Sequence, residues 1–315
     1  MKRAARNLDL QSQRARSAFV FLAPMMLILA VVAFWPLLRS FWFAFTDTSL
    51  SDLYGGHWVG FDNFLRWKVL GSGRILWRGV LADPVWWTAV YNTAVFSLWS
   101  VSIGAVVGVI MALVLNAEYP FRGLVRAAVL IPWAIPTIVS ARIWGWMLND
   151  QFGIINDAFM SVGLISEKVT WIAQPRLAMA WVVVVDVWKN APFVALLVLA
   201  ALQMISKDIY EAARLDGINP VKVFFRVTLP LIWPALLVAV LFRLLDALRV
   251  FDIIYVLTAN APGTKTMSIV SYENMIIFDQ FGYGSAQSTI LFFIVAVCAV
   301  VIIQVGRLKL ADDSQ

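Results

Sequence analysis

The chain has 315 residues, of which 61% are hydrophobic and only 14% are charged, whereas an ordinary soluble domain has roughly a quarter of its residues charged. This composition excludes a soluble globular protein and predicts a polytopic membrane protein. The single cysteine, Cys298, cannot form an intrachain disulfide, and no GxxxxGK[ST] stretch is present to hold a nucleotide in a phosphate loop. The net charge of +6 does not indicate a nucleic-acid partner, because the basic residues gather between apolar runs.

The N-terminal residues 1–17 are polar and basic, and an apolar run follows them directly. They resemble the start of a signal peptide, but the apolar run is too long and lacks a clear small-residue cleavage site. We expect 1–17 to be a cytoplasmic tail, 18–310 to form one transmembrane domain, and 311–315 to be a C-terminal tail.

Apolar runs of about 20 residues, enough to cross ~30 Å of hydrocarbon, recur along the chain. The six predicted spans cover residues 18–45, 88–115, 124–148, 176–202, 231–258 and 288–305. The second span contains Gly104 and Gly108, a spacing that suits close helix packing. The sequence therefore predicts an all-α bundle of six transmembrane helices.

Basic residues also predict the orientation of these spans, because short loops rich in Lys and Arg usually face the cytoplasm. They are dense in the N-terminal tail, in the short loop near residue 122, in the loop 204–230 and after residue 305. They are sparser per residue in the longer loops 46–87, 149–175 and 259–287. We therefore expect both termini in the cytoplasm and the three longer loops outside.

The longest polar interruption in the second half of the chain, residues 204–234, predicts two short helices joined by a turn. Ser206 suits the N-cap of the first helix and Gly217 its C-terminal end. Asn219 and Pro220 suit the start of the second helix. The expected apolar face of the first helix consists of Tyr210, Ala213 and Leu215.

Charged residues inside the spans are functional candidates, because an ionisable group in hydrocarbon costs several kcal/mol unless it faces protein or water. One stripe of the fourth span contains Asp186, Lys189, Asn190 and Phe193. In the fifth span, charges recur every three residues at Arg243, Asp246, Arg249 and Asp252. Steps of three drift by about 60° each on a helix, so these four cannot line one groove. We expect the first two to face the interior and the last two to lie nearer the outer surface.

The third span adds Trp133 and Thr137, which lie one helical turn apart. A tryptophan ring can stack on the apolar face of a sugar, and Asp, Asn and Arg side chains can bind its hydroxyl groups. This mixture suits a neutral polyhydroxylated solute. The alternative is structural, since buried Asp–Arg pairs often join helices and Trp often lies at membrane interfaces.

The loop after the fourth span carries a specific motif. The run Glu211-Ala212-Ala213-Arg214-Leu215-Asp216-Gly217, followed by Phe224 and Leu229-Pro230, resembles the EAA loop of binding-protein-dependent ABC importer permeases. One departure is Ile218, where that family usually has alanine. The resemblance implies a type I ABC importer permease fold in which the loop 204–230 forms a cytoplasmic coupling helix that sits in a cleft of an ATPase subunit. It implies ATPase coupling by Glu211, Ala212, Ala213, Asp216 and Gly217.

The segments 130–149, 186–203 and 242–258 resemble the sugar-importing branch of the same family, and the pattern is closest to trehalose importers. Positions that hold the solute in maltose-type relatives fall here on Trp133, Thr137, Asp186, Asn190, Phe193, Arg243 and Ala247. Lys189 and Asp246 complete the candidate substrate-binding set. Asp186 and Arg243 stand where maltose-type members have neutral amides, so the contact pattern is expected to differ.

The resemblance implies a permease subunit that moves a disaccharide, with trehalose or maltose favoured, into the cytoplasm by alternating access. Implied partners are a second related permease, two ATPase subunits that use ATP and Mg²⁺, an extracytoplasmic solute-binding protein and membrane lipid. We expect no cofactor, metal or catalytic residue in this chain. The alternatives are an importer of sugar alcohols or glycerol phosphate, a proton-coupled secondary transporter that uses the intramembrane charges, and a membrane-embedded enzyme, for which no nucleophile–base pair is apparent.

Overall fold

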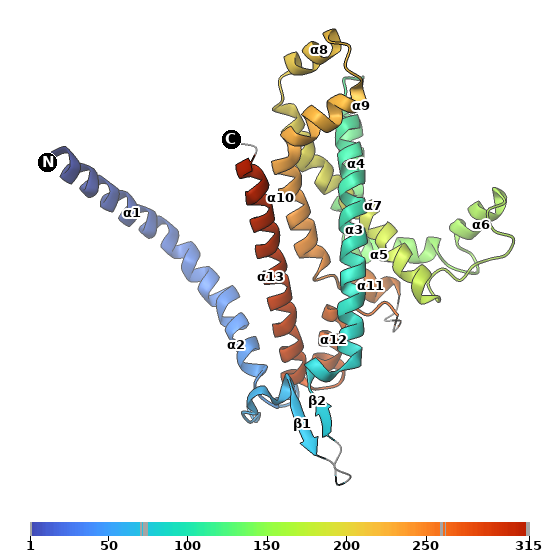
Figure 1. Cartoon of the computed structure of the whole chain (residues 1–315). Helices are drawn as coiled ribbons and strands as arrows, with labels where there is room; N and C mark the ends of the chain where they lie inside the picture. The colour runs from blue at the N-terminus through green and yellow to red at the C-terminus, as the bar shows by residue number, and fades with distance from the viewer. Residues whose placement is uncertain (1, 70, 72–74, 259–260, 262, 313–315) are drawn as a thin grey trace. The chain divides into compact units, whose positions relative to one another are not determined.

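The structure is a computed structural model that describes residues 2–69, 71, 75–258, 261 and 263–312. The described chain is mostly helical, and Figure 1 shows its elements. It divides into two compact units, Met1–Ala82 with Asn274–Thr289, and Asp83–Glu273 with Ile290–Gln315. The expected C-terminal tail falls mostly on 313–315, outside the described residues.

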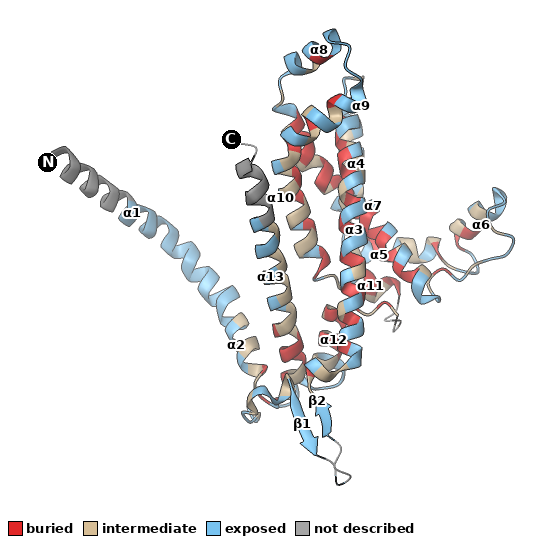
Figure 2. Ribbon diagram, viewed as in Figure 1, coloured by how far each residue is buried: buried red, intermediate tan, exposed pale blue. Residues whose placement is uncertain are grey.

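The first unit begins with a long helix. α1 (Lys2–Leu29), a π-helical turn (Ala30–Phe34) and α2 (Trp35–Phe43) follow one another without a break. The stretch Ala15–Phe43 is long and apolar enough to cross a membrane, and its side chains are mostly exposed (Figure 2). The helix therefore continues through residue 17, where the tail is expected to end and the first span to begin.

The loop after the first span contains a β-hairpin that the sequence pattern did not predict. After a 3₁₀ turn (Gly60–Asn63), β1 (Arg66–Val69) pairs antiparallel with β2 (Ile75–Arg78), and a second 3₁₀ turn (Val80–Ala82) follows. Every residue in both strands is exposed. The hairpin is thus held together by the pairing of its two strands and not by burial in a hydrophobic core.

The second unit is built on the packing of α3 (Pro84–Asn116) against α7 (Pro175–Gln203). Gly108 permits their close approach, because a Cβ added there would stand 2.6 Å from the Cβ of Val194. A Cβ added at Gly104 would meet nothing within 4 Å. Of the predicted glycine pair, only Gly108 therefore lies at a close helix contact.

The third predicted span is not one continuous helix, which corrects the expectation for 124–148. It consists of α4 (Arg122–Ala134) and α5 (Thr137–Met147), which meet at 91°. Ile135 has extended backbone angles (φ −70°, ψ 134°) because the ring of the following Pro136 disfavours a helical conformation there. The α4 carbonyls next to this break have lost their helical hydrogen-bond partners.

The fifth span also differs from the predicted 231–258. α9 (Pro220–Val223), a π-helical turn (Phe224–Thr228) and α10 (Leu229–Ala247) form one continuous run, so the span begins within the polar loop. Pro220 is tolerated because it stands in the first turn of α9, where a helix does not need its N–H group. The π-helical turn accommodates the absence of an N–H group at Pro230 within the continuous run. The helix then ends at Ala247, and a separate short helix, α11 (Asp252–Leu257), follows.

The remaining helices are α6 (Ile154–Ser161), α8 (Lys207–Leu215), α12 (Met267–Tyr272) and α13 (Phe281–Asp312), with a π-helical turn at Glu273–Ile277. In the part of the chain that the structure describes, five helices could each cross a membrane, and there are six candidate spans if the bent pair α4–α5 is counted as one. The predicted class, an all-α polytopic membrane protein with six candidate spans, is confirmed.

Candidate functional site

A buried charged network joins three of the spans. Arg243 of α10 donates a hydrogen bond from Nη2 to Oδ2 of Asp186 on α7 (2.6 Å) and another from Nη1 to Oδ2 of Asp246 (2.7 Å). Ser100 of α3 donates to the same Asp186 oxygen and accepts from Arg243 at 3.3 Å. The network therefore connects α3, α7 and α10 through one guanidinium.

The two carboxylates of this network lie in different environments. The side chains of Arg243 and Asp186 are 5% and 8% exposed, whereas that of Asp246 is 68% exposed. Asp246 therefore keeps a carboxylate accessible at the edge of the buried pair. The arrangement can therefore hold its buried pair together and still present an acceptor to a polar solute.

A small polar cavity of about 150 Å³ opens beside the network. It is lined by Thr137, Asp186, Asn190, Asp246, Ala247, Arg249, Val250, Phe251, Asp252 and Ile253. The side-chain amide of Asn190 donates a hydrogen bond to Oδ1 of Asp186 at 2.8 Å, and this bond fixes the orientation of the Asn190 amide. The cavity is smaller than the roughly 300–1,000 Å³ of a usual small-molecule pocket, so it can enclose only part of a disaccharide.

Three of the four charged residues of the fifth span, Asp246, Arg249 and Asp252, line the polar cavity, whereas Arg243 does not. Arg249 and Asp252 do not continue the helix of Arg243 and Asp246, because α10 ends at Ala247 and α11 begins at Asp252. The turn between the two helices brings Arg249 and Asp252 back towards Asp246.

Lys189 lies behind the cavity and does not line it. Its ammonium group donates to the backbone carbonyls of Ile135 (2.5 Å), Trp133 (3.4 Å) and Pro132 (3.5 Å). These carbonyls belong to the end of α4, where the break before Pro136 leaves acceptors unpaired. Lys189 therefore stabilises the bend between α4 and α5, and its contact with substrate stays a prediction.

The predicted aromatic residues form a cluster of their own. The rings of Trp133 and Phe193 stack with centroids 6.0 Å apart and an interplanar angle of 25°, and Phe193 meets Phe242 edge to face at 6.4 Å. None of the three is among the residues that line the polar cavity. Trp133 is nevertheless exposed, so its ring is accessible to a solute.

The structure brings together five of the nine predicted substrate-binding residues around the cavity: Thr137, Asp186, Asn190, Asp246 and Ala247. Sequence reasoning missed Ser100, Arg249, Asp252 and Phe251 as members of the site. Ser100 carries a signal that was available, since it is a hydroxyl residue in the middle of an apolar span. Phe251 has no such signal in the sequence, because its place at the cavity depends on the turn after α10.

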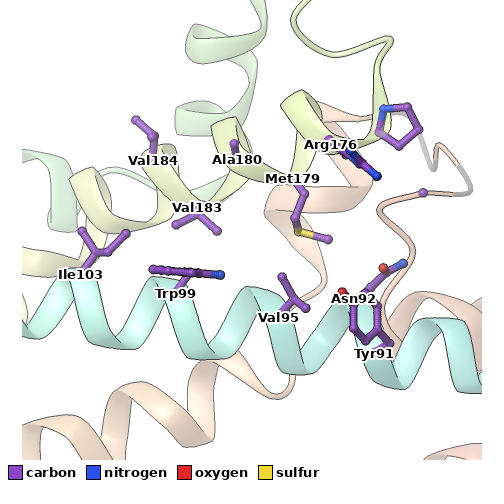
Figure 3. A pocket seen from close by; sticks show the side chains of 12 residues that line it. Tyr91, Asn92, Val95, Trp99, Ile103, Arg176, Met179, Ala180, Val183 and Val184 are labelled. Carbon is purple, nitrogen blue, oxygen red and sulfur yellow. The ribbon is translucent and has the colours of Figure 1, made fainter.

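A larger groove of about 640 Å³ lies between α3 and α7, but its chemistry differs (Figure 3). Its walls are mostly apolar and include Trp99, Ile103 and Val183, while Arg176 lies at one end. It contains no member of the charged network. A polar solute would find few hydrogen-bond partners there, so the smaller cavity is the better candidate site.

The predicted motif loop forms the helix α8. The Ser206 side chain accepts a hydrogen bond from the amide of Asp208 at 3.3 Å and so caps its N-terminus. At the C-terminus, Gly217 has φ +69°, and the amides of Gly217 and Ile218 donate to the carbonyls of Arg214 and Ala213 at 3.0 Å. This is the Schellman arrangement that glycine favours, so the two predicted helix ends are confirmed.

The surface of α8 is almost entirely exposed (Figure 2). Glu211, Ala212, Asp216 and Gly217 are exposed, and only Ala213 is buried. The expected apolar face was wrong at Leu215, which is 89% exposed, because it lies two residues after Ala213 and so points away from it. α8 thus presents both acidic and apolar groups to a partner.

Two contacts hold α8 to its surroundings. The hydroxyl groups of Tyr210 and Thr228 are hydrogen-bonded at 3.2 Å, which connects α8 to the π-helical turn before α10. Lys207 donates to Glu118, and this hydrogen bond holds the pKa of the Glu118 carboxyl below its usual value. Side-chain hydrogen bonds thus connect α8 both to the π-helical turn before α10 and to the segment after α3.

The fold and the site together define a membrane permease: several candidate spans contribute to a cavity lined by charged and polar side chains instead of a uniformly apolar core. The family described as "Binding-protein-dependent transport system inner membrane component" matches residues 104–308, and the chain belongs to this family. The resemblance noted for the motif loop is thereby confirmed. The chain is a multi-pass translocation component of such a transport system.

Three relatives match almost the whole chain. The trehalose/maltose transport system permease protein MalF of Thermococcus litoralis is 38% identical over 95% of this chain and 97% of its own length. The trehalose transport system permease protein SugA of Mycobacterium tuberculosis is 34% identical over 92% of this chain and 88% of its own. The sulfoquinovosyl glycerol transport system permease protein SmoG of Agrobacterium fabrum is 31% identical over 93% and 91%.

Solved structures support the fold. A chain of a bacterial ABC transporter involved in the import of the acidic polysaccharide alginate superposes with a TM-score of 0.78 at 22% identity, over 96% of this chain and 98% of that one. At this level of identity the likeness shows the fold alone. The fold is that of an ABC importer permease, as the sequence predicted.

Proposed function

We propose that this chain is the sugar-conducting permease subunit of an ATP-driven importer, with a disaccharide such as trehalose or maltose as the favoured substrate. The observation that carries the proposal is the polar cavity beside the Arg243–Asp186 pair, set among the membrane spans. The similarity to permeases for trehalose, maltose and sulfoquinovosyl glycerol supports a carbohydrate substrate.

Sugar recognition would use hydrogen bonds together with aromatic stacking. Asp246, Asn190 and Thr137 supply acceptors and donors to the cavity. The stacked pair Trp133 and Phe193 offers an aromatic surface for the apolar face of a sugar ring. Because the buried pair is already satisfied, solute hydroxyls would bind at its exposed edge and would not break it.

Energy coupling would come from outside the chain. We propose that α8, with Glu211, Ala212, Ala213, Asp216 and Gly217, docks on an ATPase subunit. Two such subunits would bind ATP and Mg²⁺, and this chain would hold no cofactor. This arrangement requires α8 and both termini to face the cytoplasm, as the distribution of basic residues favours.

A second permease subunit is part of the proposal, because a cavity of about 150 Å³ cannot enclose a disaccharide alone. A solute-binding protein would deliver the sugar to the opposite face, at the loops 46–87, 149–175 and 259–287. Within this proposal, residues 1–17 form the N-terminal tail, residues 18–310 the transmembrane domain and residues 311–315 the C-terminal tail. Lipid surrounds the spans, and no nucleic-acid contact is involved.

The test is uptake of radiolabelled trehalose and maltose by cells that express the chain together with a second permease, an ATPase and a solute-binding protein of the same transport system. We expect uptake that stops when ATP is depleted and that persists when a protonophore collapses the proton gradient. Asp186→Ala and Arg243→Ala should both impair uptake. Arg122→Gln, at an exposed position outside both the cavity and the loops proposed to meet the solute-binding protein, is the control and should transport normally.

Two outcomes would contradict the proposal. Uptake by the chain alone, driven by a proton gradient, would favour a secondary transporter. Uptake of glycerol phosphate or a sugar alcohol in place of a disaccharide would keep the importer and replace its substrate.

A further inference from the structure

The β1–β2 hairpin separates its side chains into two chemically different faces. Cross-strand partners share a face and successive residues alternate between faces. The register pairs Trp67 with Trp77, Val69 with Ile75, Arg66 with Arg78, and Lys68 with Leu76. One face is therefore entirely apolar, with Trp67, Val69, Ile75 and Trp77. The opposite face carries Arg66, Lys68 and Arg78 beside Leu76.

The apolar face lacks a protein cover within the described ranges of the chain. Its four side chains are between 53% and 65% exposed, and the two tryptophan rings lie with centroids 6.1 Å apart. An isolated two-stranded hairpin is marginally stable at best in water, and a contiguous exposed apolar patch marks an interaction surface. The hairpin therefore requires an apolar environment on this face.

Chain connectivity limits where that environment can be. Arg78 ends β2, and Pro84 begins α3, a 33-residue helix that is long and apolar enough to cross the membrane. The few residues between them can extend over no more than about 20 Å. The hairpin must therefore stay near the membrane surface at which α3 begins.

We propose that the hairpin lies in the headgroup layer of the phospholipid bilayer, with its apolar face towards the acyl chains. Trp prefers this interfacial region, since its ring is apolar and its N–H is polar. The basic face stays within reach of lipid phosphates, because long basic side chains extend towards polar surroundings. One of its residues, Arg66, also lies 3.6 Å from the carboxylate of Asp62. The hairpin is thus an interfacial anchor next to the first two spans.

Site-directed spin labelling of the full-length chain in phospholipid nanodiscs tests the proposal. Cys298 is replaced by serine, and a nitroxide is attached at Val69→Cys or Ile75→Cys on the apolar face. The matched controls are Lys68→Cys and Leu76→Cys, one residue away on the opposite face. Collisions with oxygen, which concentrates in lipid, are compared with collisions with a water-soluble nickel chelate.

We expect the ratio of oxygen to nickel collisions at positions 69 and 75 to exceed that at 68 and 76 several-fold. Removal of both tryptophans, by Trp67→Ser with Trp77→Ser, should lower the ratio at position 75. Equal nickel access on both faces would overturn the proposal, since the hairpin would then be in water. Immobile labels shielded from both reagents would overturn it as well, because a protein partner would then cover the apolar face.

Discussion

The guanidinium of Arg243 and the carboxylate of Asp186 form a buried ion pair of 2.6 Å that joins α10 to α7. Ser100 and Asn190 complete the hydrogen bonds of the carboxylate. A buried pair adds little net stability, but the loss of one partner leaves the other charged and unpaired. Loss of either partner is therefore expected to destabilise the contact between α7 and α10.

Arg243→Met should destabilise the protein by about 3–5 kcal/mol, because it leaves the Asp186 charge buried without its partner. Asp186→Asn combined with Arg243→Met removes both charges and should recover part of that loss. The measurement is thermal unfolding of the purified chain in lipid nanodiscs. An unchanged unfolding temperature in Arg243→Met would mean that the pair is not buried in the folded protein.

Lys189→Met should weaken the bend between α4 and α5, because three carbonyls at the end of α4 lose their donor. We expect faster hydrogen exchange in 132–137 and a lower maximal rate of sugar uptake. Lys189→Arg keeps a donor and should recover part of the protection. If Lys189→Met instead raised only the sugar concentration needed for half-maximal uptake, with exchange unchanged, Lys189 would be a substrate contact.

Gly108→Ala should destabilise the α3–α7 packing by about 1–3 kcal/mol, because the new methyl group would overlap Val194. Gly104→Ala is the matched control on the same helix, where an added Cβ has open space. It should be neutral or slightly stabilising, since alanine favours helix over glycine. Equal effects of the two substitutions on thermal unfolding would contradict the close contact at Gly108.

Glu211→Lys should abolish ATP-driven uptake while the chain still inserts into the membrane, because it reverses a charge on the exposed surface of α8. Arg122→Glu also reverses a charge at an exposed position, in the short loop before α4, and should leave uptake intact. Membrane fractions are blotted to confirm equal amounts of each variant. Normal uptake by Glu211→Lys would remove the coupling role of α8.

Asp279 should make the loop at Leu50 and Ser51 sensitive to acid. Hydrogen bonds from the Ser51 side chain and from the Ser51 and Leu50 amides lower the pKa of Asp279 below the ordinary 3.8. A carboxylate with a lowered pKa stabilises the folded state above its ordinary pKa, and this contribution is lost as the pH falls through the lowered value.

The measurement is the exchange protection of the Leu50 and Ser51 amides, corrected for intrinsic rates. Protection should fall on acidification, and Asp279→Asn should lower it already at neutral pH. Asn is a fair substitute because Asp279 has a left-handed backbone (φ 55°), which Asn tolerates. Protection that is independent of both changes would exclude the carboxylate as the element that orders this loop.

Local chemistry predicted much of the fold. The ends of α8 followed from Ser206 and Gly217, since capping depends on neighbours within a few residues. The break at Pro136 was equally local, yet it was missed because the apolar run continued through it. The hairpin was missed because its short strands lie in a loop with no core to impose a longer alternating pattern.

The site was predicted less completely. The charges at 186, 243 and 246 were recognised because a charge inside an apolar span is costly and so conspicuous. The sequence does not predict that Arg249 and Asp252 line one cavity with Asp186 and Asp246, because the predicted fifth span continues as one helix past Ala247. The helical stripe of the fourth span could not predict that Lys189 binds carbonyls at the break after α4, because those carbonyls belong to another part of the chain.

The sequence by itself determined the membrane class, the number of spans and the identity of the motif loop, because hydrophobic length and capping are properties of short stretches. Only the tertiary structure decided which charges meet, where the spans break and which side chains line the cavity. Those features depend on contacts between helices that are far apart in the chain, and a periodic pattern within one helix carries no information about its neighbours.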